Sequence, residues 1–417
     1  MEEGKTRSPA EKLLKKANRF YEKGNYRYAA KLFSKLLDLE PNNAEIYFYR
    51  ATSYYLLNKY DLAIQDYDKF IESNPDYFHA HNNRGNAHIC LKQYGRAIKD
   101  YTKAIELDPN YTLTYFNLAH AYYELGKYKQ AILNYDKVVE LDQSYLSAYY
   151  WRGMAYYNSK KYTFAIPDFD KVIELDTNHF WAYQNRGNSY KQLRQYEIAI
   201  EDYDKAAEIN PHEFATYFNR GLVYSDLKQY SRAIQDYTKA VELNPNFGKA
   251  YFNRGGAYFN LKKSGQALQD YTKSIELNPD DYERYFYRGN IYFNLKQYER
   301  AVRDYNKVIQ LNPDFDGAYI NRGEAYYYLK DYEAAVRDFN KALQINPRND
   351  EAWNNRGAAF IWLEQYERAI KDLNKAIQLN PEYGDAYYNR GLCRQNQGDE
   401  EGAKADFDKA KRLRRKK

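Results

Sequence analysis

The sequence predicts an all-α protein, built as a solenoid of helix–turn–helix repeats. Three observations lead to this prediction: one segment recurs at a fixed distance, aromatic residues follow helical spacing, and proline recurs at one position. The segment YFNRGLVYSDLKQYSRAIQDYTKAVELNPNF (217–247) recurs 34 residues later as YFNRGGAYFNLKKSGQALQDYTKSIELNPDD (251–281). Such a period is typical of stacked supersecondary units rather than of one globular core.

The repeat register starts at Ala10 and reaches Lys417 without insertion or deletion. It gives twelve repeats, whose first residues are 10, 44, 78, 112, 146, 180, 214, 248, 282, 316, 350 and 384. Positions within a repeat are numbered 1 to 34 from these residues. We expect residues 1–9 to be disordered and residues 10–417 to form a single solenoid.

Each repeat contains two predicted helices. Position 8 is always Gly or Ala and position 20 is always Ala, so these two columns mark the point where the helices cross closely. Aromatic residues at positions 4, 11 and 24 have helical spacing within each segment. Proline at position 32 of most repeats ends the second helix, because the residue before a proline avoids helical geometry.

The last repeat is more polar than the others. Arg394 replaces the aromatic residue of position 11, Glu400 replaces the tyrosine of position 17, and residues 395–397 are polar amides. A terminal repeat needs a polar outer face, because no neighbour covers it. We therefore expect a capping repeat and the end of the array at residue 417.

These columns resemble the tetratricopeptide repeat, and the resemblance covers residues 10–417. It implies a right-handed α-α superhelix of twelve repeats, in which the first helix of each repeat lines a concave inner face. It also implies that the repeats depend on stacking with their neighbours for stability.

The composition argues against several classes of partner. The chain has 63 basic and 57 acidic residues, a balance that favours neither nucleic acid nor a membrane surface. The first 20 residues contain no apolar run that could act as a secretory h-region, and no stretch reaches the roughly 18 consecutive apolar residues of a membrane helix. Cys90 and Cys393 lie far apart and suggest no disulfide framework. We expect a cytoplasmic protein without a cofactor.

Position 7 is arginine in ten repeats, which alone would suggest a phosphate-binding row. Position 23 is aspartate in the same ten repeats, from Asp66 to Asp406, and the two repeats without the arginine also lack the aspartate. This matched occurrence predicts an Arg–Asp ion pair, within one repeat or between neighbours, that satisfies the guanidinium charge. The pairing argues against RNA binding.

Position 6 is the strongest candidate for a binding column. It is asparagine in eight repeats, a residue that is unfavourable inside helices. The eight residues are Asn83, Asn117, Asn185, Asn219, Asn253, Asn321, Asn355 and Asn389. An amide offers a donor and an acceptor, so such a row could bind the backbone of an extended peptide. The alternative is an asparagine inherited through repeat duplication and bonded to a neighbouring helix.

This column resembles the asparagine ladder in the repeat domain of protein O-GlcNAc transferases, which holds extended substrate peptides. Nothing in this chain resembles the glycosyltransferase domain. By the same family analogy, positions 5 and 12 face inward and are rich in aromatic residues, among them Phe218, Phe259 and Phe293. An aromatic groove with interspersed amides suits a peptide with apolar side chains, although core packing is the alternative role for each ring.

Two tryptophans form a second candidate site. Trp151 replaces the asparagine of position 6, and Trp181 lies at position 2 of the next repeat. Family geometry places positions 6 and 2 of successive repeats near one ligand, and tryptophan is enriched in binding hot spots. We therefore predict an anchoring pocket at this pair, with space filling as the alternative.

Other known functions fit the sequence poorly. The window closest to a chaperone carboxylate clamp, with Gln184, Asn188 and Lys249, lacks two of the three expected cations. Six scattered histidines show no triad or zinc spacing, and His81 and His88 occupy columns where aromatic residues pack, with no Cys or carboxylate completing an evident site. We therefore expect no enzyme and no metal.

The sequence thus predicts a non-enzymatic scaffold that binds one or more proteins, or an extended polypeptide segment, in a concave groove. A substrate-recruiting or regulatory subunit of a separate enzyme is the alternative. A repeat array with no specific ligand, made regular by duplication or consensus-like design, is a third interpretation.

Overall fold

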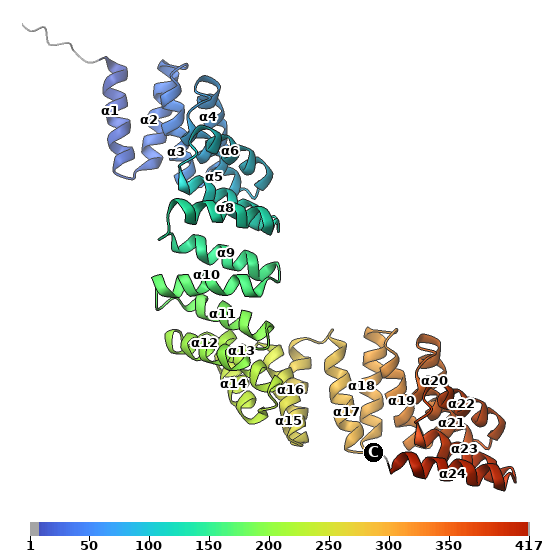
Figure 1. The fold of residues 1–417 in the computed structure, drawn as a ribbon. Coiled ribbons are helices and arrows are strands. Elements are labelled where there is room, and N and C mark those ends of the chain that lie inside the picture. The colour runs from blue at the N-terminus through green and yellow to red at the C-terminus, as the bar shows by residue number, and fades with distance from the viewer. Residues whose placement is uncertain (1–7, 416–417) are drawn as a thin grey trace, which may run out of the picture. The chain divides into compact units, whose positions relative to one another are not determined.

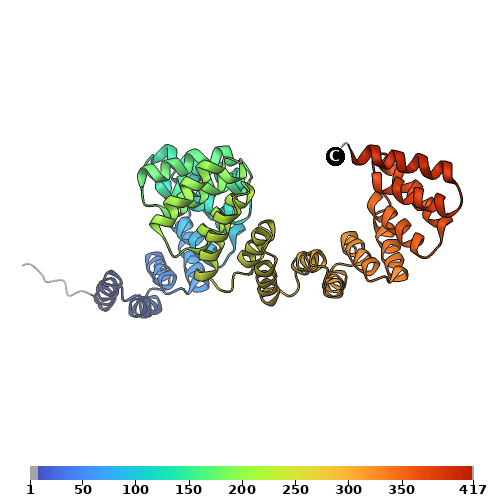
Figure 2. The ribbon, with the colours of Figure 1, turned by 90° about the horizontal axis from the view of Figure 1, so that it is seen from below.

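The computed structural model describes residues 8–415 of the chain. These residues form twenty-four α-helices and no strand, so the all-α prediction is confirmed. The helices belong to two compact units, one ending at Pro211 and the other beginning at His212. Within each unit the two helices of every predicted repeat lie side by side, and successive pairs stack (Figure 1, Figure 2).

Odd-numbered helices are the first helices of their repeats and even-numbered helices the second. The first unit contains α1 (Pro9–Glu22), α2 (Tyr26–Leu39), α3 (Ala44–Leu56), α4 (Tyr60–Ser73), α5 (Phe78–Cys90), α6 (Tyr94–Leu107), α7 (Thr112–Glu124), α8 (Tyr128–Leu141), α9 (Leu146–Asn158), α10 (Tyr162–Leu175), α11 (Phe180–Gln192) and α12 (Tyr196–Ile209). The second unit contains α13 (Phe214–Asp226), α14 (Tyr230–Leu243), α15 (Gly248–Asn260), α16 (Ser264–Leu277), α17 (Tyr282–Asn294), α18 (Tyr298–Leu311), α19 (Asp316–Tyr328), α20 (Tyr332–Ile345), α21 (Asp350–Trp362), α22 (Tyr366–Leu379), α23 (Gly384–Asn396) and α24 (Glu400–Arg414).

The small residues of position 8 lie where the two helices of a repeat cross, as predicted. A Cβ atom built on Gly85 would come within 2.6 Å of the Tyr101 ring, and one on Gly221 within 2.7 Å of the Tyr237 ring. Glycine therefore lets the large residue of position 24 pack against the first helix. The backbone of position 20 lies at the same crossing, 3.3 Å from a Cβ on Gly187 in the case of Ala199.

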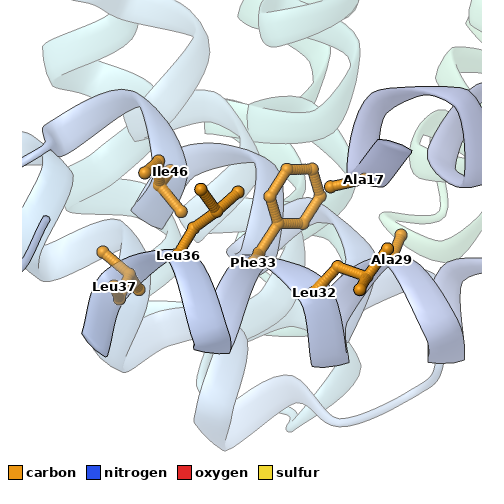
Figure 3. Close-up of a cluster of buried hydrophobic side chains, with 7 residues drawn as sticks. All are labelled: Ala17, Ala29, Leu32, Phe33, Leu36, Leu37 and Ile46. Atoms are coloured by element: carbon orange, nitrogen blue, oxygen red, sulfur yellow. The ribbon is translucent and has the colours of Figure 1, made fainter. Parts of the chain in front are cut away.

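The core is shared between neighbouring repeats. Ala17 from α1, Phe33 and Leu36 from α2, and Ile46 from α3 bury their side chains in one cluster (Figure 3). Each large side chain in such a cluster contributes roughly 1.5–3 kcal/mol by leaving water. Because Ile46 comes from the second repeat, the first repeat completes its core only by stacking on it.

The first helix begins before the predicted register. Ser8 caps α1 in a capping box, accepting from the Glu11 backbone N–H at 3.1 Å while its own N–H donates to the Glu11 carboxylate at 3.0 Å. Pro9 occupies the first helical turn, where its missing N–H costs nothing. The rest of the segment predicted to be disordered, residues 1–7, lies outside the described residues.

A left-handed residue ends the turn after each first helix, at position 15. Glycine fills it at Gly24, Gly126 and Gly398, with φ between 69° and 82°. Nine other residues adopt the same conformation, with φ between 57° and 65°: Asn58, Lys92, Lys160, Arg194, Lys228, Lys262, Lys296, Lys330 and Glu364. Positive φ is sterically unfavourable for residues with a Cβ atom, so these nine turns carry backbone strain.

Candidate functional site

The arginines of position 7 are bound inside the fold. In each of the ten repeats that have both residues, the guanidinium donates two hydrogen bonds to the aspartate of position 23 in the same repeat; Arg322 binds Asp338 at 2.6 and 2.7 Å. A third bond often reaches position 25 of the preceding repeat, as from Arg152 to Asp136 at 2.7 Å. Burial opposes the charge of Arg152, but the hydrogen bonds that it donates to Asp168 and Asp136, with the charges of these two carboxylates, outweigh burial and raise its pKa. The predicted ion pair is confirmed.

Two buried histidines share one of these aspartates. His88 Nε2 lies 3.7 Å and His81 Nδ1 4.0 Å from the Asp100 carboxylate, which Arg84 also binds. Burial opposes ionisation of Asp100, but the nearby His81 ring and the hydrogen bonds from Arg84 lower its pKa. Asp100 was not linked to these histidines in the sequence, because position 23 lies on the other helix of the repeat. The cluster is part of the core, and residues 8–415 contain no group of three or more side chains suited to a metal ion.

The asparagines of position 6 mostly bond to the preceding first helix. Asn117 donates to Asn86 at 3.0 Å and Asn321 to Asn290 at 2.8 Å. Asn355 donates to Glu324 at 2.7 Å. Asn185 and Asn389 likewise donate to Tyr150 and Asn354 of the preceding repeat. These asparagines therefore link neighbouring repeats. A bond to a neighbouring helix is the contact expected if the asparagine was inherited through repeat duplication.

Three members of the column differ. Asn253 donates to the Lys249 carbonyl of its own helix at 2.8 Å. Asn83 accepts from the amide of Asn82 at 3.3 Å. Asn219 lies half-buried on α13. Asn253 thus presents an amide whose removal breaks no contact between helices.

The acceptor of position 9 joins two donors in the regular arrangement. Asn290 Oδ1 accepts from Asn321 and from the Tyr305 hydroxyl, which lies 2.8 Å away. Asn86 does the same with Asn117 and Tyr101. Positions 6, 9 and 24 thus form one hydrogen-bonded triad across two repeats, a link that column-by-column analysis of the sequence missed.

The two tryptophans have separate surroundings. Trp151 is half-buried, with its ring 5.0 Å from His120, 5.1 Å from Tyr123 and 5.5 Å from Tyr150. Trp181 is 51% exposed and contacts the Phe180 ring at 4.8 Å. Among the described ring contacts, none joins Trp151 to Trp181.

One cavity of the second unit opens on its first helices. It measures about 480 Å³ and lies on α15, α17 and α19, with one ring each from α16 and α18. Its walls are aromatic, amide and acidic: Gly256, Phe259, Asn260, Tyr271, Tyr287, Asn290, Ile291, Phe293, Asn294, Tyr305, Asn321 and Glu324. Asn321, Phe259 and Phe293 were candidate binding residues from the sequence. Glu324, Tyr287 and Gly256 were not.

A smaller cavity of the first unit uses the same columns. It measures about 290 Å³ and is lined by Tyr55, Asn86, Ile89, Cys90, Tyr101, Leu113, Phe116, Asn117 and His120. Asn86, Tyr101 and Asn117 occupy the positions of Asn290, Tyr305 and Asn321. His120 occupies the position of Glu324.

The carboxyl group of Glu324 has a strongly raised pKa. Burial raises its pKa, the nearby charge of Glu351 adds to this, and the hydrogen bond from Asn355 opposes both, leaving a pKa of about 7. The signal in the sequence is a single glutamate in column 9, which otherwise holds neutral residues and His120.

Comparisons with known proteins agree with the fold. Profiles of the tetratricopeptide repeat match residues 79–111, 147–179, 180–213, 214–247, 248–281, 317–349 and 350–383. Further profiles of this repeat match residues 119–160 and 289–330, 14–71, and 100–132, 270–303 and 373–405. Comparison with curated proteins gave no match. No helix of the described residues is long and apolar enough to span a membrane.

Solved structures are similar to parts of the chain. The C-terminal part of a TPR repeat-containing protein from Cytophaga hutchinsonii is 24% identical, with a TM-score of 0.52, covering 58% of this chain and 98% of that one. MamA from Desulfovibrio magneticus RS-1 is 25% identical, with a TM-score of 0.39 and coverages of 41% and 96%. YrrB, described as a TPR protein with an unusual peptide-binding site, is 24% identical, with a TM-score of 0.42 and coverages of 45% and 96%. These likenesses concern the fold. Because one repeat profile alone matches more than half of the sequence, the chain belongs to the tetratricopeptide-repeat family.

Proposed function

We propose that this protein is a non-enzymatic scaffold that binds an extended polypeptide segment along its first helices. The observation that carries the proposal is the pair of cavities, one in each unit, built from the same columns of the first helices. Concave sites with aromatic walls and a few polar groups are the usual form of ligand-binding sites.

Amides and rings on this face suit an extended peptide. Asn260 and Asn294 line the cavity of the second unit beside Phe259 and Phe293. Rings bury apolar side chains, while amides bond backbone groups regardless of the side chains beside them. The asparagines of position 6 belong to this proposed site, and several of them also form contacts between repeats. Trp151 and Trp181 remain proposed contact residues, but as two separate rings and not as one pocket.

Site-specific cross-linking tests where a partner binds. A photo-reactive amino acid replaces Asn260, on the cavity wall, in one variant of the full chain and Lys273 in the other. Both lie in one repeat, and Lys273 pairs with Glu276 on the second helix. We expect cross-links from cell extract at residue 260, mapped by mass spectrometry to short segments of other proteins. Cross-links concentrated at residue 273 would place the interaction on the second helices and contradict the proposal.

The asparagine column has its own test in Asn253. Asn253→Ala removes an amide that bonds only its own helix, so weakened partner binding with an unchanged melting temperature would assign the amide to the ligand. Unchanged binding in this variant would leave the column with its structural role alone.

A further inference from the structure

The cavity of the second unit contains a carboxyl group that the fold leaves incompletely bonded. At the equivalent position Asn290 accepts from Asn321 and Tyr305, but Glu324 accepts from Asn355 only. The second donor is missing because position 24 of this repeat is Phe339, whose ring has no hydroxyl. One carboxylate oxygen of Glu324 is therefore left without a donor from residues 8–415.

The fold also supplies no positive charge to Glu324. Among residues 8–415 no basic side chain forms an ion pair with it, and no Lys or Arg of these residues lines the cavity. Its charged neighbour is Glu351 on α21, which has the same sign. A partly buried carboxylate without a cation is unfavourable, so the site lacks the partner that such a charge requires.

The walls around Glu324 are suited to a long side chain. Tyr287 is 45% exposed and Phe259 is 37% exposed, and both line the cavity together with Phe293. Aromatic faces attract cations and also pack against the methylene stem of Lys or Arg. Gly256 keeps the space open, since a Cβ atom there would meet nothing closer than the Tyr271 hydroxyl at 3.5 Å.

We propose that this cavity binds a lysine or arginine side chain of the extended polypeptide, with the cationic group on Glu324 and the stem against Tyr287, Phe259 and Phe293. The inference rests on the proposed function and names the side chain that the site selects. An acidic or phosphorylated residue would be repelled by Glu324 and Glu351. An apolar residue would bury the carboxyl of Glu324 further without giving it a partner. The pKa of about 7 for Glu324 agrees with a group that a bound cation would return to its ionised form.

Peptide pools test the preference. The probes are nonapeptide pools with blocked ends, in which the central residue is fixed as Lys, Arg, norleucine, citrulline or Glu and the other positions are randomised. The full chain is immobilised, and the retained amount of each pool is measured by mass spectrometry. We expect the Lys and Arg pools to be retained about tenfold more than the norleucine and citrulline pools, the size expected for one charge-assisted contact.

Variants assign the preference to this cavity. Glu324→Gln keeps an acceptor for Asn355 and is expected to reduce the preference to within about twofold. Gly256→Leu should fill the cavity and reduce the preference for basic pools to the same extent. Leucine is compatible with this position of the repeat, because Leu222 occupies it in α13. Glu283→Gln, an exposed acid of α17 that does not line the cavity, is the control and should keep the preference. Circular dichroism confirms that each variant is helical.

The outcomes separate this inference from the proposed function. Peptides retained without preference for a basic residue, or a preference that survives in Glu324→Gln, would overturn the assignment to Glu324 and leave peptide binding intact. Retention of no pool by the unmodified chain would overturn peptide binding and this inference together.

Discussion

The cavities of the two units share a hydrogen-bonded triad and differ in the titratable group of position 9. Asn86, Tyr101 and Asn117 in the first unit form the same hydrogen-bonded triad as Asn290, Tyr305 and Asn321 in the second. At position 9 of the following repeat, His120 lines the cavity of the first unit and Glu324 lines the cavity of the second.

Burial acts on these two groups in opposite directions. It lowers the pKa of His120, against the smaller opposing effect of Glu124, so burial favours the neutral ring. It raises the pKa of Glu324, which still ionises near neutral pH. The repeated columns thus supply the shape of a cavity, while a single variable position sets its charge. Four experiments test this difference between the units.

The largest effect is expected at the arginines of the same two repeats. Arg288→Ala leaves the buried Asp304 without its cation, which typically costs about 3–5 kcal/mol. Arg84→Ala should cost about 1–2 kcal/mol less, because His81 and His88 remain beside Asp100.

Urea denaturation measures both costs. Trp151 and Trp181 lie in the first unit and Trp353 and Trp362 in the second, so fluorescence reports one unit when the other pair is replaced by Phe. Equal costs for the two arginine variants would show that the histidines give Asp100 no support.

The next difference is in the pH dependence of stability. The pKa of Glu324 is about 7 in the fold against an ordinary 4.5, so the folded state holds its proton more tightly. Its contribution to stability is full below about pH 4.5 and is lost as the pH rises through 7. By linkage, Glu324→Gln should be more stable than the unmodified chain by up to about 3 kcal/mol at pH 8 and equal to it at pH 4.5.

The first unit should show the opposite sign. The pKa of His120 lies below its ordinary value of 6.5, so its contribution is full above pH 6.5 and is lost as the pH falls. Urea midpoints at several pH values measure both effects. Parallel pH profiles for Glu324→Gln and the unmodified chain would contradict the assignment to Glu324.

Binding of a basic peptide should weaken as the pH falls. A cation binds ionised Glu324, so the Kd should rise about tenfold from pH 8 to pH 6, through the pKa of about 7. The other titratable groups near Glu324 are Glu351, Tyr305 and Tyr383, and all six histidines of the sequence lie at or before residue 212. Isothermal titration calorimetry should find a Kd that does not change with pH in Glu324→Gln. The same change of Kd with pH in this variant as in the unmodified chain would place the titrating group elsewhere.

The smallest effects concern the shared triad. Asn117→Ala and Asn321→Ala each remove one hydrogen bond between repeats and should cost about 1 kcal/mol in free energy of unfolding. Asn253→Ala should cost under about 0.5 kcal/mol, because its bond stays within one helix. Unequal costs for Asn117 and Asn321 would mean that the two cavities are not built alike.

Most of the fold could be predicted from the sequence, because the packing columns keep the same physical role from repeat to repeat. The small residues of position 8 and the paired Arg and Asp columns led directly to the helix crossing and the ion pairs. The site was less predictable because its residues act together across columns. Glu324 is the single glutamate of position 9, but its missing donor is evident only when Phe339 and Asn355 are considered with it. Asp100 meets His81 and His88 only once the helices pack.

The strained turns at position 15 have a consequence for how this chain tolerates change. Nine of them hold a residue other than glycine in a left-handed conformation, which costs roughly 1–2 kcal/mol for a residue with a Cβ atom. Since repeats contact mainly their neighbours, relief of one turn stays local to its own part of the array. A destabilising change on the binding face could thus be offset by a glycine in the adjacent turn, one repeat at a time. New specificities could in this way evolve, or be engineered, with local compensation.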